Sequence, residues 1–284
     1  MRTATRLIGI CIWLLFCGSA WADRPEHVTE KVAPDGAKNI EVEIDFGAGE
    51  IEVVGGDIED VAELEIYYTP RWVAYEVDYQ KRGETGHLLL ESELRRKSGD
   101  RDLDNEWHIK LSRRYPCEFV ADIGACEATL DLGGIPLTSI NMDIGAASGI
   151  LEFSEPNPER LREFDVEIGA SSFELLDLGN ANIELMTFSC GAASCELDFR
   201  GDFKGETELR LDVGVGSADV ILPRGIGVRV EGDDGWFSSL DFHGLDLRKV
   251  DSDIWESDDF DDNENRIIIE VDVGMGSVDI YSKR

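Results

Sequence analysis

Residues 269–280 read IEVDVGMGSVDI, and this stretch decides the fold because its pattern returns along the chain. Alternating apolar and polar residues lead to an acidic residue, an apolar residue and a glycine, and the alternation resumes after a short turn. Six further copies start at Val42, Phe119, Ile140, Phe164, Met186 and Leu209: VEIDFGAGEIEV, FVADIGACEATL, INMDIGAASGIL, FDVEIGASSFEL, MTFSCGAASCEL and LRLDVGVGSADV. Such recurrence indicates an internal structural repeat.

The copies are spaced by one structural unit. Their pivot glycines are Gly47, Gly124, Gly145, Gly169, Gly191, Gly214 and Gly274. Four successive steps from Gly124 are 21, 24, 22 and 23 residues, and a weaker copy at Gly235 lies 21 residues past Gly214. The repeating unit is therefore about 22 residues long, within the range of known repeat architectures.

Each copy has one apolar face, because successive side chains in a strand point to opposite sides. The positions one, three and five before the glycine are apolar, as in Val273, Val271 and Ile269. The positions four and six after it are also apolar, as in Val278 and Ile280, and the positions between are mostly polar or acidic. Each unit is thus predicted to be a strand, a tight corner and a second strand.

One such unit cannot bury its apolar face alone, but stacked units share a continuous core. The predicted fold is therefore all-β, a β-solenoid or β-helix-like stack that forms one elongated domain. A glycine at the corner allows positive φ or close packing between coils. The alternative is a phosphate-binding loop at glycine pairs such as Gly214 and Gly216, but that needs a helix after the loop, and here a strand follows.

Residues 1–22 have the features of a secretory signal peptide. Arg2 and Arg6 precede an apolar run, and an Ala-x-Ala cleavage site ends at Ala22. The alternatives are an N-terminal membrane anchor and a lipid anchor on Cys17. Beyond this segment, residues 23–116 are expected to form irregular coils at the N-terminal end of the solenoid.

Residues 117–284 are expected to hold the regular coils. They include an acidic insertion at residues 251–265 that is predicted to be a solvated loop. Trp255 in this insertion, like Trp236 and Phe237 before it, either contacts a partner or packs under a loop.

The chain is strongly acidic, with a formal net charge of −33. Removal of residues 1–22 takes away two arginines and no acid, which leaves 25 basic against 60 acidic residues. This charge argues against binding to nucleic acid or to an anionic membrane. No later segment is apolar enough to insert into a membrane, so we expect a periplasmic, secreted or cell-surface protein.

Three stretches carry a resemblance to a known family. A predicted strand ends at Tyr115-Pro116, DVGVGSADVILPRG spans residues 212–225, and DVGMGSVDIYS spans residues 272–282. With the succession of corners, they resemble the adhesin-like toast-rack domains of bacterial exported proteins. The last stretch is similar to the C-terminal coil of cell-wall-stress response proteins in that group. The resemblance implies a single-chain β-helix-like stack with a binding or scaffold role in the envelope, and a part in envelope stress response. It brings no catalytic residue.

The repeat favours local pairing of the four cysteines that follow the signal peptide. Cys126 and Cys190 lie in the first and fourth regular coils, roughly 14 Å apart at one strand spacing per coil. A disulfide needs a Cα separation of ~5.5 Å. Disulfides are therefore predicted between Cys117 and Cys126 and between Cys190 and Cys195, because an exported protein meets an oxidising compartment. Buried free thiols, or a redox or metal role, are the alternatives.

Coils in register would stack carboxylates in columns. The position two before the glycine is acidic in all copies but one, which has Ser189: Asp45, Asp122, Asp143, Glu167, Asp212, Asp233 and Asp272. A looser column lies five residues after the glycine: Glu52, Glu174, Glu196, Asp219 and Asp279.

Stacked like charges are destabilising, so something must offset their repulsion. Solvent and salt are one answer, and a basic partner surface is another. The third is bound calcium, which prefers oxygen ligands, with Asp122, Asp143, Glu167 and Asp212 as the predicted ligands.

No serine-histidine-acid or cysteine-histidine set can be placed on one face, and carboxylates are too common here to select an active site. We therefore expect a non-enzymatic envelope protein with no cofactor beyond the calcium considered above. Its partner is expected to be an envelope protein or polysaccharide of unknown identity. The alternative is a calcium-dependent protein of the β-helix type that binds or cleaves a polysaccharide.

Overall fold

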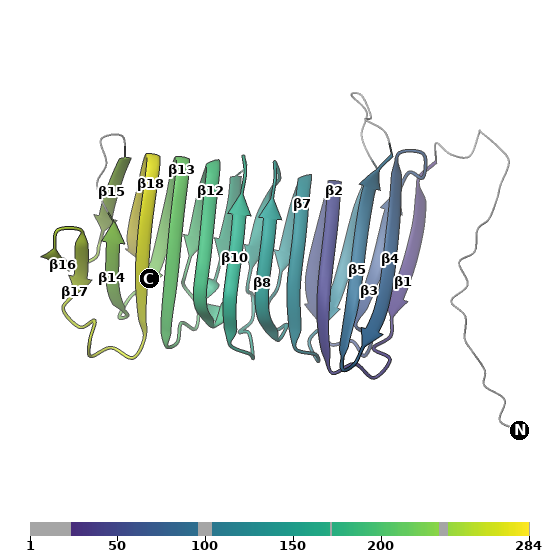
Figure 1. The fold of residues 1–284 in the computed structure, drawn as a ribbon, viewed down its shortest axis with the longest axis horizontal. Coiled ribbons are helices and arrows are strands. Elements are labelled where there is room, and N and C mark those ends of the chain that lie inside the picture. The colour runs from purple at the N-terminus through teal and green to yellow at the C-terminus, as the bar shows by residue number, and fades with distance from the viewer. Residues whose placement is uncertain (1–23, 96–103, 171, 233–237, 284) are drawn as a thin grey trace, which may run out of the picture.

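The computed structural model describes residues 24–95, 104–170, 172–232 and 238–283. These residues fold almost entirely into β-strands, which confirms the all-β class. The strands stand side by side along the long axis of an elongated molecule (Figure 1). The predicted signal peptide at residues 1–22 lies outside the described residues. Within the described ranges, no helix is long and apolar enough to cross a membrane.

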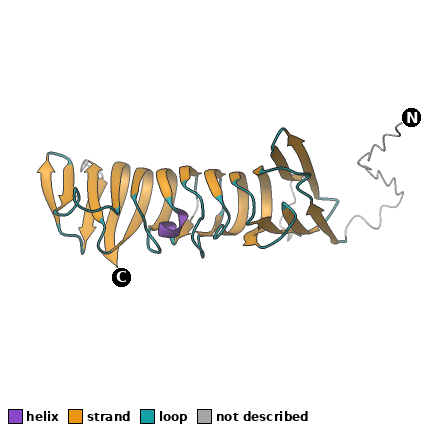
Figure 2. Ribbon diagram, turned by 90° about the horizontal axis from the view of Figure 1, so that it is seen from below, coloured by secondary structure: helices purple, strands orange, loops and turns teal. Residues whose placement is uncertain are grey.

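The seven repeat copies occupy nine strands and form the middle of the molecule. These strands are β2 (Asn39–Gly56), β7 (Cys117–Asp131), β8 (Leu137–Ile144), β9 (Ser148–Glu152), β10 (Leu161–Ile168), β11 (Ser172–Leu176), β12 (Ile183–Asp198), β13 (Glu206–Pro223) and β18 (Arg266–Lys283). Each copy pairs in parallel with the next. Successive coils are joined by loops along one edge of the stack, and one loop contains the short 3₁₀ helix η1 (Leu178–Ala181) (Figure 2).

The pairing keeps equivalent residues of successive copies opposite each other. Phe188 of β12 pairs with Leu211 of β13, and Leu211 pairs with Val271 of β18. In β13 the predicted apolar positions are buried, with Leu209 and Val220 fully covered and Leu211 only 2% exposed. The alternation in the sequence therefore places the core correctly.

The corner glycines are required by close packing between coils. A Cβ atom on Gly214 would lie 2.7 Å from the carbonyl oxygen of Gly191, and one on Gly124 would lie 2.3 Å from that of Gly47. Positive φ instead occurs two residues later, at Gly49 and Gly216. A Cβ atom on Gly49 would also lie 2.1 Å from the carbonyl oxygen of Asn105, and one on Gly216 would lie 1.9 Å from that of Ala193. Close packing therefore applies to both glycines of the corner, and positive φ applies to the second.

Order along the chain differs from order in space at the C-terminal end. β18 lies between β13 and the pair β14 (Gly227–Gly232) and β15 (Ser238–His243), both of which pair with it in parallel. The weaker copy therefore does not follow β13 directly. Its Gly235 and Asp233 lie outside the described residues. Leu240 pairs with Val278, which is one residue away from the register that an alignment on Gly235 implies.

The N-terminal end has the same arrangement. β2 lies between β7 on one side and β5 (Thr85–Leu94) and β6 (Asn105–Ser112) on the other, all in parallel. Beyond them the pairing becomes antiparallel, with β4 (Val73–Arg82) on β5. β3 (Ala62–Tyr68) lies on β6, and β1 (Glu26–Val32) lies on β3. We call β1 and β3 to β6 the N-terminal cap.

A C-terminal cap consists of β14 to β17. β17 (Ile254–Ser257) pairs antiparallel with β14, and β16 (Leu247–Asp251) pairs antiparallel with β17. The insertion at residues 251–265 is therefore not the solvated loop predicted from its acidity. Phe260 is 3% exposed, and the Arg229 guanidinium lies 4.2 Å from its ring centroid. The last coil needs a cover for its core, and the insertion's few apolar residues supply part of it.

Candidate functional site

A column of carboxylates runs along one face of the stack, as the sequence predicted. Asp45, Asp122, Asp143 and Glu167 are consecutive partners, Ser189 follows, and Asp212 and Asp272 continue the column. Burial, together with the charges of Asp45 and Asp143, raises the pKa of Asp122 above its ordinary value. The repulsion expected from stacked like charges therefore acts within this column.

The column extends into the N-terminal cap, which the sequence did not indicate. Asp45 pairs with Glu91 of β5, and Glu91 pairs with Glu76 of β4. We call the whole set the first acidic column: Glu76, Glu91, Asp45, Asp122, Asp143, Glu167, Asp212 and Asp272.

A second acidic column follows the corners on the opposite layer. Glu174, Glu196, Asp219 and Asp279 are consecutive partners, and Asp241 of β15 adds to its end. Burial and the neighbouring Asp279 raise the pKa of Asp219. The predicted member Glu52 is separated from this column, because Thr129 and Ile150 occupy the two positions between it and Glu174.

The predicted calcium ligands do not converge. Asp122, Asp143 and Glu167 lie in one line, and Ser189 separates them from Asp212. Calcium takes six to eight oxygen ligands around one point, whereas a column offers each point two neighbours about 4.8 Å apart. Among the described residues, no three histidine, cysteine or acidic side chains are placed to hold one metal ion. The calcium prediction thus has no support from the geometry.

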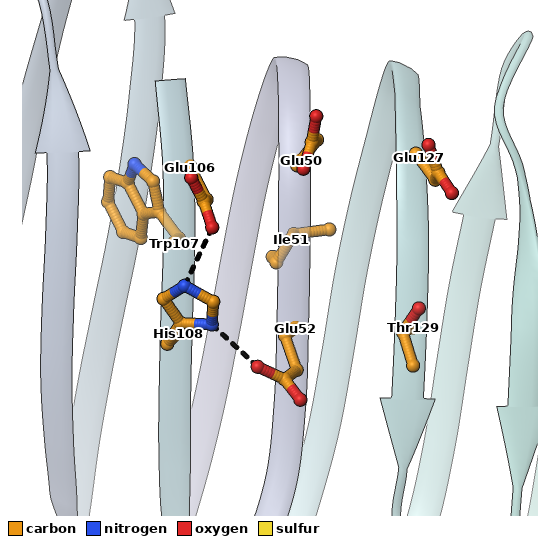
Figure 3. Close-up of a pocket in the computed structure, with 8 residues that line it drawn as sticks. All are labelled: Glu50, Ile51, Glu52, Glu106, Trp107, His108, Glu127 and Thr129. Carbon is orange, nitrogen blue, oxygen red and sulfur yellow. Dashed lines mark hydrogen bonds and ion pairs between the residues drawn. The ribbon is translucent and has the colours of Figure 1, made fainter. Parts of the chain in front are cut away.

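A pocket of about 190 Å³ lies where the N-terminal cap joins the repeat stack (Figure 3). β6 and the second half of β2 form its centre, and β7 adds its far side. The residues that line it are Glu50, Ile51, Glu52, Glu106, Trp107, His108, Glu127 and Thr129.

His108 is held between two carboxylates in this pocket. Its Nδ1 lies 2.5 Å from Glu52 Oε2, and its Nε2 lies 2.9 Å from Glu106 Oε1 (Figure 3). Burial opposes the charged form, but the hydrogen bonds to both carboxylates outweigh it and raise the pKa of His108. Four glutamates around one histidine suit a cationic group better than an anionic one.

Neither predicted disulfide is present, and all four cysteines are free. Cys117 and Cys126 lie on the same strand, β7, seven residues before and two residues after Gly124. Even if the strand doubled back fully at that corner, about 17 Å would separate them at ~3.3 Å per residue. Local pairing along a strand is therefore excluded for this pair.

Cys190 and Cys195 do face each other across their corner, as the register predicted. Their sulfurs are 3.3 Å apart, which is a contact and not the ~2.05 Å bond of a disulfide. The contact lowers the pKa of Cys190 and raises that of Cys195. The alternative prediction of buried free thiols describes both residues, which are at most 4% exposed.

Two sets of residues escaped the sequence reasoning. Serines stack at the third position after five of the corner glycines, where the sequence suggested only a small polar turn, and Ser239 of β15 extends the row: Ser148, Ser172, Ser194, Ser217 and Ser277. Histidines are the other set, because their carboxylate partners are distant in the chain. Of the aromatic residues singled out, Trp255 packs on Phe242 at 5.4 Å, while Trp236 and Phe237 lie outside the described residues.

Comparisons with known proteins give a family and several similar solved structures. Residues 22–163 match the family described as the N-terminal domain of toast_rack, DUF2154. A solved structure of a candidate cell adhesion protein from Clostridium sporogenes has a TM-score of 0.51 and 18% identity, covering 92% of this chain and 100% of that chain. A candidate adhesin from Bacteroides fragilis has 11% identity and a TM-score of 0.34, covering 92% of this chain and 97% of that chain. No curated protein matches the sequence.

Proposed function

This chain belongs to the toast-rack family, and from that premise we propose that it is an exported, adhesin-like binding protein of the bacterial envelope. It acts as a scaffold without catalysis, and its two acidic columns are its binding surfaces. The Clostridium sporogenes structure, which covers 92% of this chain, is described as a candidate cell adhesion protein, which supports this proposal.

The observation that carries the proposal is the register of the columns. We interpret the parallel stack as a β-solenoid with coils of about 22 residues, an architecture that presents long, regular surfaces to extended partners. Carboxylates at the same position of successive coils give such a surface a repeat of about 4.8 Å. The stacked carboxylates repel each other, and binding of a cationic partner would offset this repulsion.

The proposed partner is an envelope protein or polysaccharide that carries cationic groups along its length. Charge complementarity would steer it to the columns and make binding sensitive to salt. Export rests on residues 1–22, which have the features of a signal peptide. A part in envelope stress response rests on the resemblance of residues 272–282 to the C-terminal coil of stress-response proteins.

The experiment is co-sedimentation of purified residues 23–284 with insoluble envelope fractions and with isolated envelope polysaccharide, at low and high salt. The test variant carries D45N, D122N and D143N in the first acidic column. The matched control carries D261N, D262N and E264Q in the loop between β17 and β18, with the same change in net charge. We expect the column variant to lose most of the sedimenting fraction and the control to keep it.

Equal loss in both variants would mean that only net charge matters and would refute the column as the binding surface. The soluble products of the same incubation should be analysed for shortened glycans. Release of such products by the wild-type protein would overturn the non-enzymatic proposal in favour of a polysaccharide-cleaving protein.

A further inference from the structure

Three histidines lie where the caps join the repeat stack. His87 of β5 sits opposite Glu41 of β2, with Nδ1 2.7 Å from the carboxylate. His108 of β6 sits opposite Glu52 of the same strand β2, at 2.5 Å. The N-terminal cap is therefore tied to the first repeat copy through both of its layers.

The same contact occurs at the other end. His243 of β15 places Nε2 2.8 Å from Asp279 of β18. Its ring stacks on Tyr281, its partner in register, with centroids 4.6 Å apart. β18 carries the last repeat copy, so this histidine ties the C-terminal cap to the stack.

Acidic groups outnumber basic ones around each ring. His108 faces Glu52 and Glu106, with Glu65 and Tyr67 of β3 beside it and Lys110 two residues along its own strand. Near His87 the charged and polar groups are Glu41 and Glu43 of β2 and Asp78, Gln80 and Arg82 of β4. Near His243 they are Asp279, Tyr281 and Lys283 of β18, Asp241 of β15 and Asp219 of β13.

The middle of the molecule has no such group, since the sequence contains no histidine between residues 109 and 242. Histidine changes its charge between about pH 5 and 8, whereas carboxylates titrate mostly below that range. Histidine charge changes near neutral pH therefore fall on the caps, where His27 of β1 is the fourth histidine, and not on the regular coils.

We propose that His87, His108 and His243 form a pH-dependent clasp that fastens both caps to the repeat stack in mild acid and loosens them above neutral pH. Protonation turns each contact between a neutral ring and a carboxylate into an ion pair across strands. Loosened caps leave the outer edges of β2 and β18 open, and open edges pair with other chains.

The sign follows from linkage. A histidine whose pKa is raised in the folded state stabilises that state fully below its unfolded value, near 6.5. This stabilisation disappears as the pH rises through the folded value. The raised pKa of His108 agrees with this direction, which rests in the first place on the three contacts.

The test is hydrogen exchange by mass spectrometry on residues 23–284 at pH 6.0 and pH 8.0, corrected for the intrinsic rate at each pH. We expect protection of β5, β6 and β15, relative to β10 and β12, to fall severalfold from pH 6.0 to 8.0, because the ion pairs that hold the cap strands to the stack are lost. The H87Q/H108Q/H243Q variant should lose this pH dependence.

Glu196→Gln is the matched control, because it removes a carboxylate from the middle of the second acidic column where no histidine lies. It should keep the pH dependence of the caps. If the triple variant does not fold, E41Q/E52Q/D279N removes the same contacts from the other side. An unchanged difference in either variant, or an equal change in protection across all strands, would overturn the clasp. Neither result would bear on whether the columns bind a partner.

Discussion

The regular coils and the caps bury the apolar faces of their strands in different ways. From β7 to β13, each repeat copy pairs in parallel with the next copy, so residues of the same kind lie opposite each other. Carboxylates lie opposite carboxylates, and glycines pack on glycines. In the caps, the strands next to the stack are still parallel to it, whereas the outer strands are antiparallel. Unlike residues meet there more often, as His108 and Glu65 do. The middle gains a continuous core at the cost of like-charge repulsion, whereas the caps gain ion pairs and closed ends.

The largest expected difference between the two regions lies in side-chain burial. Phe164 is fully buried and packs edge-on against Phe153 of the neighbouring coil at 6.2 Å. Phe164→Ala should lower the free energy of unfolding by about 3–5 kcal/mol, as typical for a buried aromatic residue. Urea denaturation followed by circular dichroism measures it.

Trp255→Ala is the matched change in the C-terminal cap, where the ring is partly buried against Phe242. It should cost about half as much, since less area returns to water. An equal loss of unfolding free energy in the two variants would show that the cap is as tightly packed as the coils. It would contradict the expected difference in burial.

The second difference concerns glycine. Gly214→Ala should cost about 1–3 kcal/mol, the usual range for overpacking, because the new Cβ would meet the Gly191 carbonyl at 2.7 Å. Gly83, in the β4–β5 turn, has φ of 66° and open space around it. Gly83→Ala should cost about 1 kcal/mol through its backbone alone.

Asparagine separates these two causes, since it tolerates the left-handed region. Gly83→Asn should recover most of the stability lost in Gly83→Ala, and Gly214→Asn should be worse than Gly214→Ala. Thermal melting of the four variants measures both pairs. Recovery at position 214 would contradict the role of close coil packing.

The third difference concerns pH. The pKa values of Asp122 and Asp219 are raised in the fold by burial and by neighbouring carboxylates. The folded state therefore binds protons more readily than the unfolded chain, so stability should rise as the pH falls from 7 toward 4. The Tm of wild-type protein should increase over this window, and Asp122→Asn should make the increase smaller.

This acid response belongs to the coils, while the histidine contacts of the caps respond between pH 6 and 8. A Tm that falls steadily from pH 7 to 5 would show that other groups outweigh the columns. If hydrogen-exchange protection of β12 and of β15 changed over the same pH range, the distinction between the two regions would be lost.

The smallest effect is expected from calcium. Since no three described acidic, histidine or cysteine side chains converge on one point, calcium at millimolar concentration should raise the Tm no more than sodium chloride of equal ionic strength. Screening alone then relieves the columns. A much larger shift with calcium would restore the metal site that the sequence suggested.

The coils could be predicted because their information is local. The apolar positions around Gly214 specify a strand, a corner and a strand, and the repeat specifies what packs on it. The columns follow from the same register, which is why Asp122 and Asp143 were expected to be neighbours and are.

The caps could not be predicted in this way because their contacts join distant residues. His108 and Glu52 are 56 residues apart, and nothing near either residue indicates the other. The acidity of residues 251–265 suggested solvent, yet Phe260 is buried by tertiary contacts. The pairing of Cys117 with Cys126 failed because proximity in sequence is distance along an extended strand.

The position of β18 has a consequence for how the chain is made. Synthesis delivers β13, then β14 and β15, and only then the strand that separates them in the finished sheet. Until residues 266–283 emerge, β13 has one unpaired edge and the two cap strands have no parallel neighbour. A nascent chain thus stays incomplete at this end, and the sheet closes there only when β18 is added.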